Sequence, residues 1–323
     1  MAASPQANST VVAASAPLHG PVAVLINAAG GAAARLGRND LYRRIVSAFA
    51  RHDMAVEPVF LGSGDMAGAI EAALAASRDL GAVVAGGGDG TINAIAQHLA
   101  GSAVPLGILP LGTYNHFARD LGIPLDIDGA VATIAAGHAS AVDLGEVNER
   151  IFANNSSIGF YPELVRDRDR QRRKSRRQKW LAALVALFHV LRHLPRRRLR
   201  IEAEGWVEPR RTPFAFVGNN LYSTDLFAPR HRRTLSGGEL CLFVASPDGL
   251  FGIVRMLLRA ALGRLDEDSD FESRRLRALT IQSHRRHHKV SLDGEVVILR
   301  PPLRYRIRPR ALRVLVPATE PDA

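Results

Sequence analysis

The chain has 323 residues, of which 47% are hydrophobic, and a formal net charge of +11. This length exceeds the usual size of one domain, so we expect two domains with separate cores, and the composition excludes a disordered chain. The single cysteine, Cys241, excludes an intramolecular disulfide framework and suits a reducing, cytoplasmic compartment.

The start of the chain does not read as a targeting signal. Residues 1–20 are rich in Ala, Ser and Pro and lack both a basic start and a continuous apolar stretch, so we expect a disordered leader. Residues 318–323 read as a short tail. The longest apolar run, 180–191, is too short to span a bilayer, and we expect no transmembrane segment.

Charge is divided unevenly along the sequence. Residues 1–150 carry 8 Lys and Arg against 13 Asp and Glu, whereas residues 151–323 carry 34 against 18. A basic half next to an acidic half predicts that one part of the protein meets an anionic surface, either lipid or nucleic acid.

The first part of the chain alternates between apolar runs and helical patterns. Residues 21–27 (PVAVLIN) form a continuous apolar run that ends in AAGG, as expected of a buried parallel strand and its turn. Further strands are expected at 56–61, 82–85 and 106–109, and helices at about 39–51, 65–78, 92–99 and 114–121. This alternation predicts a doubly wound α/β domain over residues 21–140.

After residue 141 strand-like segments follow one another. They are predicted at 141–147, 150–154, 200–203, 214–218, 239–245, 279–282, 289–292, 296–300 and 312–316. Helices are expected only at about 166–193 and 249–262. The second domain, over residues 141–317, should therefore be mainly antiparallel β.

The strongest motif is GGGDGT at residues 86–91, between a predicted strand and a predicted helix. Glycines let the backbone approach a phosphate, and the following helix N-terminus offers unpaired N–H groups. Asp89 has the same sign of charge as phosphate, so it makes sense as a direct or water-mediated holder of the Mg²⁺ bound to ATP. The alternative is a plain βα turn, but the motif exceeds what a turn requires.

A second motif, LGTYNHFAR at residues 111–119, again places Gly-Thr between a strand and a helix. It should lie at the same carboxyl edge of the sheet as the glycine loop, where open α/β sheets bind ligands. Thr113 is a candidate ligand residue, and the alternative is that it caps the helix.

A third motif, SLDGE at residues 291–295, lies between two predicted strands. Asp-Gly is a common hairpin turn, and that structural role is one interpretation. The other is that a carboxylate on the turn accepts the proton of a lipid hydroxyl that attacks the γ-phosphate of ATP.

Together, the three motifs resemble the catalytic domain of the diacylglycerol kinase, sphingosine kinase and ceramide kinase family, particularly its bacterial lipid kinases. The resemblance covers about residues 21–317. It implies a nucleotide-binding α/β domain, a C-terminal β-sandwich and a site in the cleft between them. It also implies ATP and Mg²⁺ as cofactors and a diacylglycerol-like or long-chain lipid alcohol as substrate.

The resemblance also assigns roles to individual residues. Asp89 takes the magnesium-linked role, Glu295 that of the proton acceptor, and Asp293 that of its partner or competitor. The implied nucleotide contacts are Asn27, Ala28, Ala29, Gly30, Gly31, Gly88, Asp89, Gly90, Thr91, Ile92, Asn93, Ala94 and Thr113.

The sequence departs from the family pattern at several positions. Ala28 and Gly30 replace a Pro and a Ser of the family's first turn, and His116 stands where many relatives have Asp. Residues 235–239 (LSGGE) lack the aspartates with which some bacterial members bind a structural Mg²⁺, so we do not expect that metal. These substitutions keep open a catalytically weak member that acts as a lipid-binding regulator.

Two basic segments are candidates for a surface contact. Residues 166–179 hold nine basic and two acidic residues and run into an apolar stretch that begins at Trp180. This arrangement predicts peripheral contact with an anionic membrane, at the inner membrane surface; the alternative is a solvated helix whose continuation packs in the core. Residues 284–289 (HRRHHK) could equally be an exposed approach to a strand.

Two other functions compete with lipid phosphorylation. Nucleic-acid binding through the arginine runs would leave GGDGT and DGE unexplained, and no recognised nucleic-acid motif is present, so we expect no such partner. An NAD kinase-like activity would share the glycine loop, but the late DGE and the run FARDLGIP after Asn115 favour a lipid substrate.

Overall fold

The computed structural model describes residues 14–15, 18–27, 36–62, 66–75, 79–159, 197–221, 234–246 and 270–318, together with positions 252, 255 and 259. The chain divides into two compact units. Unit 1 is Met1–Val142 with Arg310–Ala323, and unit 2 is Asp143–Pro309.

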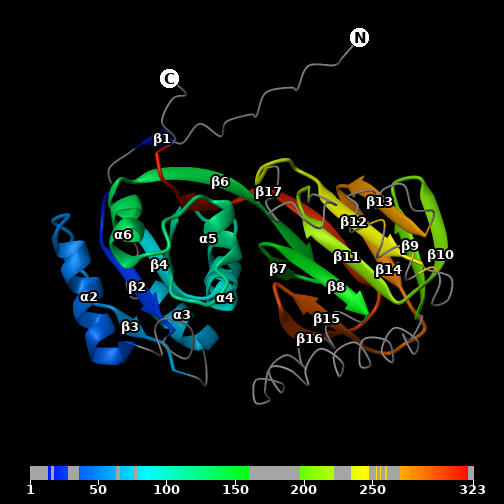
Figure 1. The fold of residues 1–323 in the computed structure, drawn as a ribbon, viewed down its shortest axis with the longest axis horizontal. Coiled ribbons are helices and arrows are strands. Elements are labelled where there is room, and N and C mark those ends of the chain that lie inside the picture. Colours follow the sequence, from blue (N-terminus) through cyan, green and yellow to red (C-terminus); the bar gives the residue numbers. More distant parts are fainter. Residues whose placement is uncertain are drawn as a thin grey trace, which may run out of the picture. The chain divides into compact units, whose positions relative to one another are not determined.

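Unit 1 is built on a parallel sheet. Its strands are β2 (Val22–Ile26), β3 (Val59–Phe60), β4 (Ala82–Gly87) and β5 (Leu106–Pro110), in the order β3-β2-β4-β5. Its helices are α2 (Arg38–Ala50), α3 (Met66–Ala75), α4 (Asp89–Leu99), α5 (His116–Asp120) and α6 (Ile127–Ala135). Helix α2 packs against α6, and α3 against α4; Figure 1 shows the two pairs on either side of β2 and β4.

The burial pattern explains this layering. Every residue of β4 is buried, as expected of a central strand covered on both faces. Helix α4 buries Ile92, Ile95 and Leu99, a helical spacing that gives one apolar stripe toward the sheet. Helix α6 begins at a capping residue, Asp126, whose carboxylate accepts the N–H of Gly129 at 2.8 Å.

The strand order creates a topological switch point. β2 is followed in sequence by β3 on one side, whereas β4 lies on its other side. The carboxyl ends of β2 and β4 therefore lie at the switch point, the place where open α/β sheets bind ligands.

Two short segments join unit 1 from elsewhere in the sequence. The end of β17 (Leu303–Leu315) pairs in parallel with β5 at Val314, and it buries Leu312, Val314 and Leu315. Residues from Arg310 onward thus belong to unit 1, although the sequence assigned residues up to 317 to the second domain. Within the expected leader, β1 (Ala14–Ser15) pairs with His138 and Ala139 of β6, a pairing that the sequence did not indicate.

Unit 2 contains two sheets. The first includes β9 (Arg197–Ala203), β10 (Trp206–Thr212), β14 (Ala278–Gln282) and the beginning of β17, in the order β10-β9-β14-β17, with β6 (His138–Val147) paired to β7 (Arg150–Phe152). The second is antiparallel, in the order β13 (Phe271–Leu276), β12 (Leu240–Ala245), β11 (Phe214–Asn219), β8 (Asn155–Gly159), β15 (His288–Leu292) and β16 (Glu295–Leu299).

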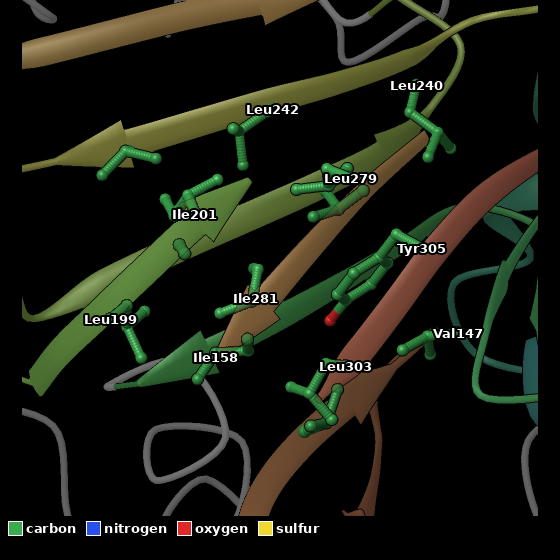
Figure 2. Close-up of a cluster of buried hydrophobic side chains, with 14 of the residues drawn as sticks. Val147, Ile158, Leu199, Ile201, Leu240, Leu242, Leu279, Ile281, Leu303 and Tyr305 are labelled. Carbon is green, nitrogen blue, oxygen red and sulfur yellow. The ribbon is translucent and has the colours of Figure 1, made fainter. Parts of the chain in front are cut away.

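The two sheets of unit 2 share one apolar core. Figure 2 shows Leu199, Ile281 and Leu303 of the first sheet gathered with Ile158 and Leu242 of the second. Tyr305 is also buried in this core, and its hydroxyl lies 3.0 Å from Ser156 Oγ. Burial raises the pKa of Tyr305 far above its usual value, so the phenol stays neutral and serves the packing of the core.

The expected fold class is confirmed: an α/β unit precedes a mainly antiparallel β unit. The helix expected at 166–193 lies outside the described residues, as does most of the one at 249–262. In the part of the chain that the structure describes, no helix combines the length and hydropathy needed to cross a bilayer.

Candidate active site

The switch point at the ends of β2 and β4 begins with Asn27. Its backbone N–H donates to the carbonyl of Gly86 at 2.7 Å, and its side-chain amide donates to Thr91 Oγ1 at 3.1 Å. Asn27 therefore ties the end of β2 to the glycine loop. The next four expected nucleotide contacts, Ala28, Ala29, Gly30 and Gly31, lie outside the described residues.

The glycine loop passes directly from β4 into α4. Gly88 precedes the helix with extended backbone (φ −92°, ψ −176°), and no side chain caps the first turn. The first N–H groups of an α-helix have no partner inside the helix, and here they carry the positive end of the helix dipole. A Cβ on Gly87 would lie 2.6 Å from Thr91 Oγ1, so glycine is required for this tight entry.

The second loop packs closely against the backbone of the first. A Cβ on Gly112 would lie less than 3.0 Å from the Cα of Gly88 and 2.7 Å from Asn115 Oδ1. The N–H groups of Leu111 and Gly112 both donate to the carbonyl of Gly87, at 3.0 and 3.1 Å. The predicted meeting of the two motifs at one edge of the sheet is therefore observed.

Asn115 holds the second loop in shape. It is buried and has left-handed backbone (φ 51°, ψ 47°), which asparagine tolerates better than most residues. Its Oδ1 accepts the N–H of Gly112 at 3.0 Å, and its Nδ2 donates to the carbonyls of Pro110 and Gly112, each at 3.1 Å. No role for Asn115 was expected from the sequence, although the motif around it was the available signal.

Asp89 makes a contact that the sequence did not indicate. Its Oδ2 accepts the N–H of His116 at 3.2 Å, and its Oδ1 accepts that of Phe117 at 3.0 Å. The carboxylate thus binds the start of α5 and fixes the two loops to each other. Each carboxylate oxygen can accept a further hydrogen bond or metal contact, so the expected magnesium-linked role remains compatible with this geometry.

Thr113 does not cap the following helix. It is exposed, its hydroxyl makes no hydrogen bond with the described residues, and α5 begins only after Asn115. Next to it, the rings of Tyr114 and His116 stack at 5.6 Å and within 2° of parallel. The hydroxyl of Thr113 is thus free to meet a ligand at this edge.

The nucleotide contacts expected in α4 differ in whether their side chains or only their backbone can reach a ligand. The side chain of Ile92 is fully buried in the core, so only its backbone can meet a nucleotide. Gly90, Asn93 and Ala94 are partly exposed.

The described residues suit a magnesium ion that is carried mainly by nucleotide phosphates. Among these described residues, no group of three His, Cys, Asp or Glu side chains could hold a metal ion. His116 stands at the position where the family resemblance implies a second acid. Mg²⁺ in phosphoryl-transfer sites needs only one or two carboxylates, because phosphates and water complete its octahedron. Asp89 fits that limited role.

The loop at residues 235–239, for which the sequence predicts no structural metal, is held in place by direct hydrogen bonds. The buried Asp143 accepts the N–H of Gly238 on its Oδ2 at 2.7 Å, and its own N–H donates to Leu235 at 2.8 Å. The backbone N–H of Asn220 donates to the carbonyl of Glu239 at 3.0 Å. Gly237 and Gly238 supply no side-chain ligand, and the absence of a structural Mg²⁺ at this loop stays a prediction.

In unit 2, Asp293 and Gly294 form the two-residue turn between β15 and β16. Both have positive φ, 49° and 93°, and Leu292 pairs with Glu295 across the turn, as in a type I′ hairpin. The Asp293 carboxylate accepts three backbone N–H groups, from Ala153 at 2.7 Å, Asn154 at 2.8 Å and Asn155 at 2.9 Å. Asp293 therefore anchors the hairpin to the segment between β7 and β8.

Glu295 has the opposite surroundings. It is exposed at the first position of β16, and its carboxylate has no hydrogen bond or ion pair with any described residue. The two acids of the motif thus differ: Asp293 is engaged by the backbone, whereas Glu295 is available for chemistry.

Comparison with known proteins agrees with this arrangement. Residues 21–147 match the diacylglycerol kinase catalytic domain. The probable lipid kinase YegS-like of Pseudomonas syringae pv. tomato is 33% identical over 273 residues, which cover 80% of this chain and 83% of that protein. A diacylglycerol kinase of Staphylococcus aureus (strain JH9) is 27% identical over 230 residues, 70% of this chain and 71% of that protein.

Solved structures show the same fold. A diacylglycerol kinase from Bacillus anthracis (strain Sterne) superposes with a TM-score of 0.64 at 16% identity, over 92% of this chain and 97% of that one. A second structure from the same organism gives a TM-score of 0.70 at 19% identity, with the same coverage. The chain therefore belongs to the diacylglycerol kinase family, in its bacterial lipid kinase branch, and is a lipid kinase with an alcohol group as acceptor.

Proposed function

We propose that the protein transfers the γ-phosphoryl group of ATP to the hydroxyl of diacylglycerol or of a similar long-chain lipid. The observation that carries the proposal is the joined pair of loops at the switch point of unit 1, where Gly88 and Gly112 touch and Asp89 fixes one loop to the other.

The nucleotide phosphates would bind at the N-terminus of α4. There no side chain caps the helix, so the backbone N–H groups of residues 88–90 would be the hydrogen-bond donors. The helix dipole favours negative charge at the same place. Asn27 and Thr113 would flank the phosphates, Thr113 through its exposed hydroxyl. Positioning and charge stabilisation are what phosphoryl transfer mostly requires of a protein.

Magnesium would arrive with the nucleotide and be held on the protein side by Asp89, directly or through water. When bound, it would neutralise charge on the transferred phosphoryl group.

Proton removal from the lipid hydroxyl would fall to Glu295. Its exposed carboxylate has no competing partner among the described residues, whereas that of Asp293 is occupied by three N–H donors. Asp293 would then be a positioning residue, which holds the turn so that Glu295 begins β16 at a fixed place.

The lipid would be reached by peripheral contact at the inner face of the cytoplasmic membrane. Residues 166–179, with nine basic residues, are the segment that the sequence offers for this contact, and they lie outside the described residues. Neutralising Arg172, Arg173, Arg176 and Arg177 should weaken binding to anionic vesicles and leave ATP affinity intact. Unchanged vesicle sedimentation of this variant would remove the segment from the proposal.

The substrate is tested by a screen with γ-labelled ATP. Purified protein would be incubated with Mg²⁺ and with vesicles that contain diacylglycerol, phosphatidylglycerol, a polyprenol or a sphingoid base, with NAD as a soluble control, and the products separated by thin-layer chromatography. Label should enter diacylglycerol most rapidly. Label in NAD alone would contradict the proposal, and label in no acceptor despite ATP binding would indicate a lipid-binding regulator instead.

A further inference from the structure

The outer face of the first sheet in unit 2 holds a basic concavity of about 570 Å³. It lies over β9, β10 and the end of β14. Among the residues that line it are Arg198, Arg200, Arg211, Gln282, Ser283 and His284, and none of the described residues that line it is acidic.

Two of these arginines face each other without an anion. Arg198 and Arg211 are direct cross-strand partners in the β9–β10 hairpin, and both are exposed. Neither forms an ion pair with any residue that the structure describes. Like charges directly opposite one another destabilise a β-hairpin, so this pair costs stability unless an anion from outside lies between them.

The other arginines of the concavity are already paired. Arg200 lies 2.8 Å from Glu202, although its side chain remains 60% exposed. Arg210 contacts Glu208 at 2.8 Å and also Glu272. The uncompensated positive charge is therefore concentrated at Arg198 and Arg211.

The turn after β14 adds positive charge at the same end of the sheet. Gln282 pairs with Arg200 across the strands, so the following residues continue the basic end. His284, Arg285 and Arg286 are exposed in this turn, and the N–H of Arg285 is held by Ser283 Oγ at 3.2 Å. The run HRRHHK thus has a defined place next to the concavity.

The opposite end of the same sheet carries both signs of charge. A second concavity of about 740 Å³ is lined there by four glutamates, Glu146, Glu149, Glu202 and Glu204, together with Arg304 and Arg306. Glu146 is paired with Arg306 and Glu202 with Arg200. The basic end therefore suits a negative surface better than this end does.

We propose that this basic end docks on an anionic phospholipid bilayer and that a phosphate headgroup occupies the concavity between Arg198 and Arg211. Guanidinium groups bind phosphate through two parallel hydrogen bonds, which makes a facing arginine pair suited to a phosphodiester. The choice of a lipid surface rests on the proposed function. A single-stranded nucleic acid would in addition need aromatic side chains for base stacking, and no Phe, Tyr or Trp is among the described residues that line the concavity.

The test compares two double variants of the full chain in vesicle sedimentation. R198Q/R211Q removes two charges from the concavity, and the matched control R43Q/R44Q removes two exposed charges from α2. On phosphatidylcholine vesicles with about 30% phosphatidylglycerol, the first variant should bind roughly tenfold more weakly than the wild type, since each basic residue near such a surface contributes a several-fold effect. The control should bind as the wild type does.

Equal vesicle binding of R198Q/R211Q and the wild type would overturn the proposal. So would a loss of duplex DNA binding without loss of vesicle binding. Phosphorylation of a short-chain diacylglycerol in neutral detergent micelles separates this proposal from the proposed function: R198Q/R211Q should retain that activity. If the wild type has none, the proposed diacylglycerol substrate fails, while the vesicle comparison still decides whether the concavity binds lipid.

Discussion

Gly88 and Gly112 touch through their backbones, so that the loop after β4 and the loop after β5 form one continuous surface. Gly112 has no space for a side chain directed at Gly88, whereas a Cβ on Gly88 would lie 3.4 Å from the Cα of Gly112. Because the two loops come from neighbouring parallel strands, this contact defines the edge at which a nucleotide would be held.

The first prediction concerns this contact. Gly112→Ala would place a Cβ against the Cα of Gly88 and the amide of Asn115, so the loops must separate. ATP affinity should fall by at least tenfold, as measured by calorimetric titration, whereas Gly205→Ala, in the open β9–β10 turn, is a control that leaves affinity unchanged. Normal ATP affinity in Gly112→Ala would show that the loops do not act together.

The second prediction concerns Asp89. Asp89→Asn would present an amide N–H₂ to one of the two backbone N–H groups of His116 and Phe117, and it would remove the charge assigned to magnesium. Turnover should fall by orders of magnitude, while the free energy of unfolding should drop by only about 1–3 kcal/mol, the cost of one unsatisfied donor. Both are measurable, by labelled-phosphate transfer and by urea denaturation. Near-normal turnover would exclude the magnesium role.

The third prediction concerns Asp293. Asp293→Ala leaves three N–H groups of the segment between β7 and β8 without an acceptor, so the protein should lose roughly 2–4 kcal/mol of stability. Glu295→Ala, two residues away and exposed, should be nearly neutral in the same denaturation experiment. Equal stability of both variants would contradict the anchoring role.

The fourth prediction concerns the pH dependence of stability. His288 is buried, and neither ring nitrogen has a hydrogen-bond partner among the described residues. Burial, and then the charges of Arg197 and Arg285, lower the pKa of His288 from 6.5 to about 4. Between these two values the unfolded chain binds a proton that the folded protein excludes, so stability should fall as pH drops from about 6.5 to 4, by at most about 3 kcal/mol.

The variant His288→Leu isolates that contribution. It removes the titrating group, so its free energy of unfolding should decline less than that of the wild type between pH 7 and pH 4.5. Parallel declines in the two proteins would show that His288 does not cause the acid sensitivity.

The sequence predicted those parts of the fold that depend on local pattern. The buried strand β4 and the glycine loop after it follow from an apolar run and GGGDGT. The strand begins at Ala82 as predicted, whereas the helix begins at Asp89, inside the motif, and not at about residue 92 as expected. The same holds for the hairpin turn at Asp293 and Gly294.

Three strands were missed because their composition is not that of a buried strand. β10 contains Pro209, which an edge strand tolerates because it need not donate to a neighbour, and β13 is an edge strand rich in exposed charge. β8 carries two fully buried serines where apolar residues would be expected.

Contacts between distant residues were also beyond the sequence pattern. The carboxylate of Asp89 meets N–H groups 27 and 28 residues away, and that of Asp293 meets groups 138 to 140 residues away. Only the fold reveals that Asp293 is engaged by the backbone whereas Glu295 is not. This difference in hydrogen bonding is the structural reason for giving Glu295 and Asp293 different roles.

The most direct test of the account is transfer of labelled phosphate from ATP to diacylglycerol by Glu295→Gln. The substitution keeps the shape of the side chain and removes its ability to accept a proton. We expect the variant to fold and bind ATP as the wild type does and to phosphorylate diacylglycerol roughly 10²–10⁴-fold more slowly, the usual range for the loss of a general base. Wild-type transfer rates in Glu295→Gln would contradict the account, since the one available carboxylate of the hairpin would then take no part in the reaction.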